Sequence, residues 1–325
     1  MAKRFHALLV VRDEADIIEQ SLWHLSTWAD AVYVFDTGSV DGTWESVQSV
    51  AEENSKIHPI ARKPVYFSLP KVRSYLFHRV REHMQDGDWF LRVDADERYH
   101  VPPPEFVEKR MKSYETVAWR QYYDFRLTEE DVKRWQDGRE GFGDRERPIE
   151  ERRRCFTVSR NSEPRLCQYR STMKWPNYAS FPHHAGVIAK ERLPIRHYPH
   201  RDPVQMAKRY ALRSIQVRAE NSKTDKSLEH HWAVTDWKKD VVSNNRGDLH
   251  RWKPGQSLPK VQQRHTRPGG IRLLKRLFYA LPSVVVDGWK EGYKVDYSLD
   301  RLPDQIQQEI REAYTKIKHS GVRSY

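Results

Sequence analysis

The sequence has little cysteine and no long apolar run. Cys155 and Cys167 are the only cysteines among 325 residues, too few for a disulfide framework or a thiolate zinc site, and they suit a reducing cytoplasm. The apolar segment 7–11 ends at charged residues, so it does not resemble a signal peptide. Segment 277–286 is interrupted by a proline and is shorter than the roughly 20 residues of a spanning helix. We therefore expect a cytoplasmic protein without a transmembrane helix.

The balance of charges is positive. The chain has 57 Lys and Arg against 45 Asp and Glu, a formal charge of +12, which makes nucleotides, nucleic acid and anionic lipid candidate partners. With 11 Trp, 16 Tyr and 11 Phe, it has too many aromatic residues for a disordered polyelectrolyte. At roughly 150 residues per domain, the length suggests about two domains.

Strand and helix patterns alternate along the first third of the chain. Continuous apolar runs predict buried strands, and apolar residues at three- and four-residue spacing predict amphipathic helices between them. The predicted strands are 5–11, 31–35, 57–61 and 89–93, and the predicted helices are 14–29, 44–51 and 71–84. This order predicts an α/β fold with a doubly wound, mostly parallel sheet and helices on both faces.

The later part of the chain is less regular. We expect a strand at 117–125, a mobile loop at 138–154, a mostly irregular stretch at 176–203 and a helix at 203–218. The predicted domains are a catalytic domain at 1–218, with a nucleotide side at about 1–125 and an acceptor side at 126–218, and a basic, mainly helical extension at 219–325.

Charged side chains follow three of the predicted strands. Arg12, Asp36 and Asp94 come after the first, second and fourth strands, which places them at the carboxyl edge of a parallel sheet, where such sheets bind ligands. Asp94 and Asp96 alternate on an extended segment, so both carboxylates can share one Mg²⁺ or Mn²⁺ ion. The Asp-Gly-Asp at 86–88 precedes its strand and is interpreted as a solvated turn.

Three motifs resemble a known family. The segments VRDEADII at 11–18, FDTGSVDGT at 35–43 and VDADE at 93–97, in this order and spacing, are similar to family 2 glycosyltransferases of the GT-A fold. The resemblance covers roughly residues 3–215. It implies a cytoplasmic enzyme that transfers a sugar from a nucleotide-sugar donor, usually with inversion, using a divalent metal held by Asp94 and Asp96.

The resemblance also implies roles for individual residues. Arg12 and Glu14 would line the nucleotide pocket, Asp36 would contact the base, and Arg73 would face the donor. Asp13 stands where many relatives have Asn, and Ser74 follows Arg73 where Asn is common, so we expect contacts to the donor base that differ from those of the family.

The segment HYPHRD at 197–202 also resembles the family. Enzymes of this fold often supply a late histidine as a third metal ligand, and His197 is assigned that role, with His200 as the alternative. Arg201 could reach the diphosphate. We find no His pair at helical spacing with a general-base Glu, so a dedicated zinc site is not expected.

The general base is left open by the sequence. The acceptor hydroxyl needs one, and Asp124, Asp144 and Glu163 are candidates, although each fits a structural role as well. We name Asp124 and rank Glu163 lowest, because its turn is explained by neighbouring Asn and Pro residues. Glu97 points away from the carboxylate pair and is expected to form a salt bridge.

A basic amphipathic helix is predicted at 270–281. Arg272, Lys275 and Arg276 fall on one face and leucines on the other, with no acidic residue between 261 and 286. Such a helix could lie on an anionic bilayer, at the inner face of the membrane. The favoured alternative is a helix packed on the catalytic domain with a solvated basic face.

We therefore predict a glycosyltransferase that moves a hexosyl group from a UDP-like donor to a glycan or lipid-linked acceptor in cell-envelope or surface polysaccharide synthesis. One alternative is a nucleotidyltransferase, although segment 12–15 lacks the glycine-rich phosphate loop such enzymes carry. The other is a non-enzymatic nucleic-acid-binding protein, although no recognition helix or aromatic sheet motif is present. Nucleic acid is not an expected partner.

Overall fold

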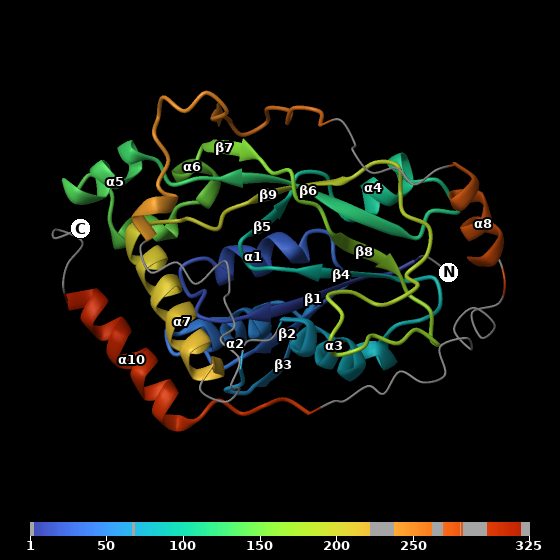
Figure 1. Cartoon of the computed structure of the whole chain (residues 1–325), viewed down its shortest axis with the longest axis horizontal. Coiled ribbons are helices and arrows are strands. Elements are labelled where there is room, and N and C mark those ends of the chain that lie inside the picture. Colours follow the sequence, from blue (N-terminus) through green and yellow to red (C-terminus); the bar gives the residue numbers. More distant parts are fainter. Residues whose placement is uncertain are drawn as a thin grey trace.

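A ten-stranded mixed sheet forms the centre of the protein, with helices packed around it (Figure 1). The computed structural model describes residues 3–66, 69–221, 237–261, 269–279, 281 and 298–319. The strands are β1 (Phe5–Val11), β2 (Ala31–Asp36), β3 (Ile57–Arg62), β4 (Trp89–Val93), β5 (Glu97–Tyr99), β6 (Val117–Phe125), β7 (Cys155–Val158), β8 (Pro164–Gln168), β9 (Leu193–His197) and β10 (His250–Arg251). The α-helices are α1 (Ile18–Ser26), α2 (Thr43–Glu53), α3 (Leu69–Val80), α4 (Pro103–Arg110), α5 (Glu129–Gln136), α6 (Ile149–Arg152), α7 (Pro203–Asn221), α8 (Gly269–Tyr279) and α10 (Asp304–His319).

The first four strands form the parallel part of the sheet. Their order is β3-β2-β1-β4, with β1 paired in parallel to both β2 and β4. The chain therefore proceeds from β1 toward one edge and then returns to the other side of β1. This reversal creates a crevice at the carboxyl ends of β1 and β4, the usual position of a ligand site in such sheets. The predicted strands of this region are confirmed.

Helices cover both faces of the parallel strands because side chains of a strand alternate between its faces. Ala7, Leu9 and Val11 of β1 join a core that contains buried residues of α1, α2 and α4. Leu8 and Val10 join a second core with buried residues of α3. The predicted two-sided packing is confirmed.

The second half of the sheet is mostly antiparallel, which the sequence did not predict. β8 pairs antiparallel with β4 and β6, and β7 pairs antiparallel with β6. β9 lies parallel to β6 and antiparallel to β5, in a stretch predicted to be irregular. Its register places His197 opposite Asp124 on one side and Glu97 on the other. Strand β9 therefore places His197 next to the segment that contains Asp94 and Asp96.

The segment 138–154 is not the mobile loop expected from its lack of periodicity. It contains the 3₁₀ helix η2 (Phe142–Glu146) and helix α6, and both Arg152 and Arg153 are buried. Arg153 forms an ion pair with buried Glu140, at 2.7 Å. Ion pairs rather than apolar periodicity fix this segment, so a pattern of hydrophobic residues could not reveal its order.

The described C-terminal segments pack against the sheet domain. Trp252 is buried in the core formed with α1 and α2, and helix α10 lies along helix α7 (Figure 1). Leu302, Ile310 and Tyr314 share an apolar cluster with Leu212 and Ile215 of α7. Helix α7 continues to Asn221, past its predicted end at 218. None of the described helices is long and apolar enough to cross a membrane.

Candidate active site

The side chains predicted to meet at the sheet edge are found there. Arg12 follows β1, Asp36 ends β2 and Asp94 follows β4, and these three strands are neighbours in the parallel sheet. All three therefore lie at the same carboxyl edge. Within the acidic segment 94–97, Asp94 and Asp96 have different partners.

Asp94 is held between two arginines. Its Oδ1 accepts a hydrogen bond from Arg73 Nη2 at 2.7 Å, and its Oδ2 accepts one from Arg165 Nη2 at 2.7 Å. Burial disfavours the charged carboxylate, but the guanidiniums of Arg165 and Arg73 outweigh it and hold the pKa of Asp94 well below its usual range. Arg165 also contacts Glu97 and the hydroxyl of Tyr122, so the predicted salt bridge of Glu97 is confirmed.

Asp96 faces a histidine that lies between two carboxylates. His197 Nε2 is 3.5 Å from Asp96 Oδ2, and its Nδ1 is 2.7 Å from Asp124 Oδ1. The imidazole also stacks on the ring of Tyr122, with centroids 4.3 Å apart. Burial lowers the pKa of His197, but the charges and hydrogen bonds of Asp96 and Asp124 outweigh it and raise this pKa to about 9. At neutral pH the ring is an imidazolium that bridges both carboxylates.

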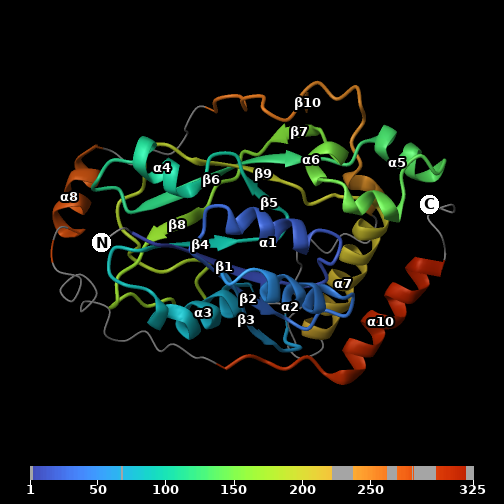
Figure 2. The same cartoon turned by 180° about the vertical axis from the view of Figure 1, so that it is seen from behind.

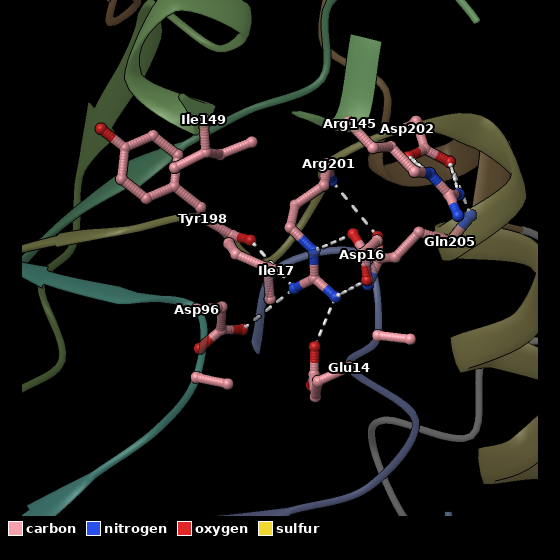
Figure 3. A network of polar contacts seen from close by, with 12 residues as sticks. Glu14, Asp16, Ile17, Asp96, Arg145, Ile149, Tyr198, Arg201, Asp202 and Gln205 are labelled. Carbon is pink, nitrogen blue, oxygen red and sulfur yellow. Dashed lines mark hydrogen bonds and ion pairs between the residues drawn. The ribbon is translucent and has the colours of Figure 1, made fainter. Parts of the chain in front are cut away.

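Arg201 joins the loop after β1 to the acidic segment (Figure 3). Its guanidinium donates to Asp16 from Nε at 2.6 Å and from Nη2 at 2.9 Å, and it also contacts Glu14. Its Nη1 lies 3.9 Å from Asp96 Oδ2. Arg201 is fully buried and engaged by these carboxylates, so the expectation that it reaches a diphosphate is not supported. It holds three acidic residues in place.

A cavity of about 420 Å³ opens beside this network. Its walls come from the loop after β1, from helix α1, from η2, from one face of α7 and from Tyr314 of α10. Its lining includes Arg12, Asp13, Glu14, Trp23, Lys208, Arg209 and Tyr314. Arg209 connects the cavity to the acidic segment, because its Nη1 is 3.3 Å from Asp96 Oδ2. Of the residues predicted to bind the nucleotide, Arg12 and Glu14 line this cavity.

Asp36 does not line the cavity, but it supports a turn that does. Its Oδ1 accepts hydrogen bonds from Gly38 N at 2.8 Å, from Ser39 N at 2.7 Å and from Ser39 Oγ at 2.9 Å. Ser39 Oγ in turn accepts from Asp13 N at 2.8 Å. Asp36 thus supports the turn that carries Arg12 and Asp13. Its buried Oδ2 has no hydrogen-bond partner among the described residues.

The three candidates for the general base have different partners. Asp124 accepts from His197 next to Asp96. Glu163 contacts Arg92 and accepts from Arg120 Nε at 3.0 Å; despite burial, the positive charges of Arg165, Arg92 and Arg120 lower its pKa to about 2. Asp144 accepts from Gly141 N and Arg147 within η2 and its flanks. Only Asp124 is in contact with the network around Asp96.

The described residues contain no group of three or more His, Cys, Asp or Glu side chains arranged to hold a metal ion. Each carboxylate oxygen of Asp94 accepts from an arginine, and Asp96 Oδ2 faces His197 and Arg209. A divalent ion needs carboxylate oxygens as ligands, and here cationic side chains take their place. The acidic residues have the right chemistry for Mg²⁺ or Mn²⁺, but their present arrangement does not fit a metal ion.

Two arginines of the site were missed by the sequence analysis. Arg165 is a buried cation within strand β8, and Arg209 lies on the same face of α7 as Gln205, Lys208 and Leu212, which all line the cavity. A charged residue inside an otherwise apolar strand and basic residues at three- and four-residue spacing were visible signals. Their role depends on the pairing of β8 with β4 and on the contact of Arg209 with Asp96, which no local pattern indicates.

Comparison with known proteins gives distant similarity only. No protein-family model matches the chain, and no curated protein matches it. One similar solved structure is the mannosyltransferase PcManGT from Pyrobaculum calidifontis in complex with GDP-Man and Mn²⁺, at 13% identity and a TM-score of 0.36, covering 70% of this chain and 66% of that one. Another is mannosyl-3-phosphoglycerate synthase from Rubrobacter xylanophilus, at 18% identity and a TM-score of 0.26, covering 38% and 41%. The matched part spans less than two thirds of either structure, and similarities of this degree establish neither activity nor substrate.

The fold and the site on their own define an α/β protein with a cavity lined by charged residues at the switch point of its parallel sheet, the usual position of a ligand in such folds. The site combines a carboxylate pair, several arginines and an adjoining cavity.

Proposed function

We propose that the chain is a glycosyltransferase that transfers a sugar from a nucleotide-sugar donor. The observation that carries the proposal is the convergence of Asp94 and Asp96 with Arg73, Arg165 and Arg209 at the carboxyl edge of β1, β2 and β4. A nucleoside diphosphate leaving group gains negative charge as the sugar departs, and fixed guanidiniums stabilise that charge most in the transition state. The family resemblance of the three motifs supports the same reaction.

The cavity is the proposed site of the nucleotide. Arg12, Lys208 and Arg209 offer positive charge to the diphosphate, and Trp23 and Tyr314 offer aromatic surface to a base or ribose. Arg12 Nη2 is a buried donor and Asp36 Oδ2 a buried acceptor, neither with a hydrogen-bond partner in the described part of the chain. Buried polar groups are normally satisfied, so both atoms favour a polar ligand at this edge.

The finer assignment is also a proposal. We infer a hexosyl donor carried by a UDP-like nucleotide, an inverting transfer, and a glycan or lipid-linked acceptor from the cell envelope. For the proton of the acceptor hydroxyl we propose Asp124 as general base, because it alone of the three candidates touches the network around Asp96. A divalent metal would screen the diphosphate, but it would require Asp94 or Asp96 to leave its arginine partners.

A thermal-shift screen tests the proposal. The panel contains UDP-, GDP- and dTDP-sugars with the free nucleotides, each with Mn²⁺, with Mg²⁺ and with EDTA. A true donor at 100 times its Kd should stabilise the folded state by about 2.7 kcal/mol and raise Tm clearly. No shift with any nucleotide sugar would contradict the proposal, and an equal shift in EDTA would contradict only its metal-dependent part.

Asp94→Asn is the matched variant for this screen, with Asp137→Asn as the control. Asp94 contacts two arginines of the site, whereas Asp137 pairs with Arg139 at the surface. The first variant should lose donor-induced stabilisation and donor hydrolysis, and the second should keep both. Asp88 is unsuitable as a control, because it is buried and accepts hydrogen bonds from the backbone N–H groups of Arg4 and Gln85. The structural role predicted for Asp88 is therefore confirmed, but this residue is buried rather than exposed to solvent as predicted.

A further inference from the structure

Exposed apolar side chains gather on one helix far from the candidate site. The large hydrophobic residues with the highest exposure along the described chain include five from this one region: Ile271, Leu273, Leu274, Leu277 and Leu281. Leu274 is 68% exposed and Leu277 is 61% exposed. Figures 1 and 2 show helix α8 at the opposite end of the molecule from α7 and α10. The patch is therefore separate from the cavity and from Asp96.

The helix is attached to the protein through its other face. The guanidinium of Arg276 lies over the ring of Tyr114, 4.6 Å from its centroid, and that of Arg170 lies over the ring of Tyr279 at 5.3 Å. Phe278 and Tyr279 are partly buried, whereas the leucines are not. The favoured expectation was an apolar face packed on the protein with a basic face in solvent. In the structure the leucine face is exposed instead, and Arg276 is exposed as well.

Exposed basic residues lie on the helix and near its attachment point at Tyr114. Arg276 is exposed, and so is Lys112, which lies two positions before the Tyr114 that Arg276 covers. The sequence from 261 to 286 contains no Asp or Glu. A leucine surface with basic residues around it is the pattern of helices that lie in the interface of anionic membranes. A second copy of the chain would bring these like charges together, which disfavours self-association through this face.

We propose that helix α8 docks on the surface of an anionic phospholipid bilayer. Leu273, Leu274 and Leu277 would enter the boundary between headgroups and acyl chains, while Arg276 and Lys112 contact the lipid phosphates. The helix need not span the membrane for this. The proposal is independent of the proposed function, because it concerns a different end of the molecule and its test does not use activity.

Vesicle flotation of the full chain tests the proposal. Vesicles of phosphatidylcholine alone are compared with vesicles that contain phosphatidylglycerol, at low and at high salt. The wild-type protein should float with the anionic vesicles, float at least about tenfold less with the neutral ones, and lose binding at high salt because screening weakens the attraction. Equal binding to both kinds of vesicle, or to neither, would overturn the proposal.

The variants separate apolar insertion from charge. L274S/L277S removes apolar side chains without changing charge, and both positions are exposed, so the fold should be kept. It should reduce binding to anionic vesicles at least about tenfold. Tyr178→Ser, at a tyrosine that is 62% exposed, is the control and should bind like wild type. Unchanged binding of the double variant overturns the proposal, and so does a wild-type dimer in solution that the double variant converts to a monomer.

Discussion

Tyr314 Oη donates a hydrogen bond to Asp13 Oδ2 at 2.9 Å, although the two residues are 301 positions apart in the sequence. Asp13 has a φ of 56°, in the left-handed region that costs energy for most residues. Its Oδ1 accepts from Val40 N at 2.7 Å. Helix α10 thus helps to hold the turn after β1, which forms one wall of the cavity.

Removal of that hydroxyl should weaken both the turn and the nucleotide site. Tyr314→Phe leaves the ring in its apolar cluster but removes a hydrogen bond to a buried carboxylate. The free energy of unfolding should fall by about 1–2 kcal/mol, measured by urea denaturation. The Kd of the nucleotide found in the thermal-shift screen should rise several-fold, because Asp13 and Arg12 line the cavity together.

The control for this change is Tyr178→Phe at an exposed tyrosine, which should alter neither quantity. A Tyr314→Phe protein of unchanged stability would show that the hydrogen bond to Asp13 is not formed in solution. Lower stability with an unchanged nucleotide Kd would place the nucleotide away from the turn after β1.

The sequence predicted the parallel half of the protein well for a physical reason. A strand buried on both faces is mostly apolar, so β1, β2 and β4 appear directly as runs rich in apolar residues, even though β4 includes the buried Arg92. A residue that follows such a strand lies at its carboxyl end, which is why Arg12 and Asp94 were found. In the antiparallel half, β6 was predicted at 117–125 and is confirmed. β8 and β9 gave no such signal, because β8 includes the buried Arg165 and β9 lies in a Pro- and His-rich stretch.

Local sequence patterns could not predict the ion pairs between segments that are distant in the sequence. Arg201 was expected to face a ligand because it is a cation in a family-like segment. In the structure it pairs with Asp16 instead, 185 positions away in the sequence. Whether a buried arginine faces a ligand or a carboxylate depends on which loops lie next to each other, and the topology of the fold determines this.

Loss of the Arg201 guanidinium should destabilise the protein strongly. Arg201→Met would leave Glu14 and Asp16 without their buried cation, and breaking a buried pair in this way costs about 3–5 kcal/mol. Urea denaturation followed by tryptophan fluorescence measures the change. Arg139→Met, which removes a cation paired with exposed Asp137, is the control and should leave the unfolding midpoint where it is.

A second change identifies the cause of that loss. In the Arg201→Met background, Asp16→Asn removes one of the unpaired charges and should recover part of the lost stability, whereas Asp16→Asn alone should be destabilising. If the double variant is no more stable than Arg201→Met, the loss comes from packing around the side chain rather than from uncompensated charge.

Stability should fall in acid because His24 is kept neutral by the fold. Its Nε2 accepts a hydrogen bond from Tyr99 N at 3.0 Å and so cannot carry a proton there. Burial, assisted by the positive charges of Arg98 and Arg196, lowers the pKa of His24 from 6.5 to about 3. Below about pH 6.5 the unfolded chain binds a proton that the folded chain does not, so stability falls as the pH decreases toward 3.

His24→Gln separates this effect from other sources of acid sensitivity, since the amide oxygen of Gln can accept from Tyr99 N without titrating. Between pH 7.5 and pH 5 the single histidine should cost the wild type about 1–2 kcal/mol of unfolding free energy, and His24→Gln should lose less by that amount. His83→Gln, at a side chain that is 54% exposed, should retain the wild-type pH dependence. Parallel curves for wild type and His24→Gln would mean that His24 titrates alike in both states, and that the contact to Tyr99 N does not keep it neutral.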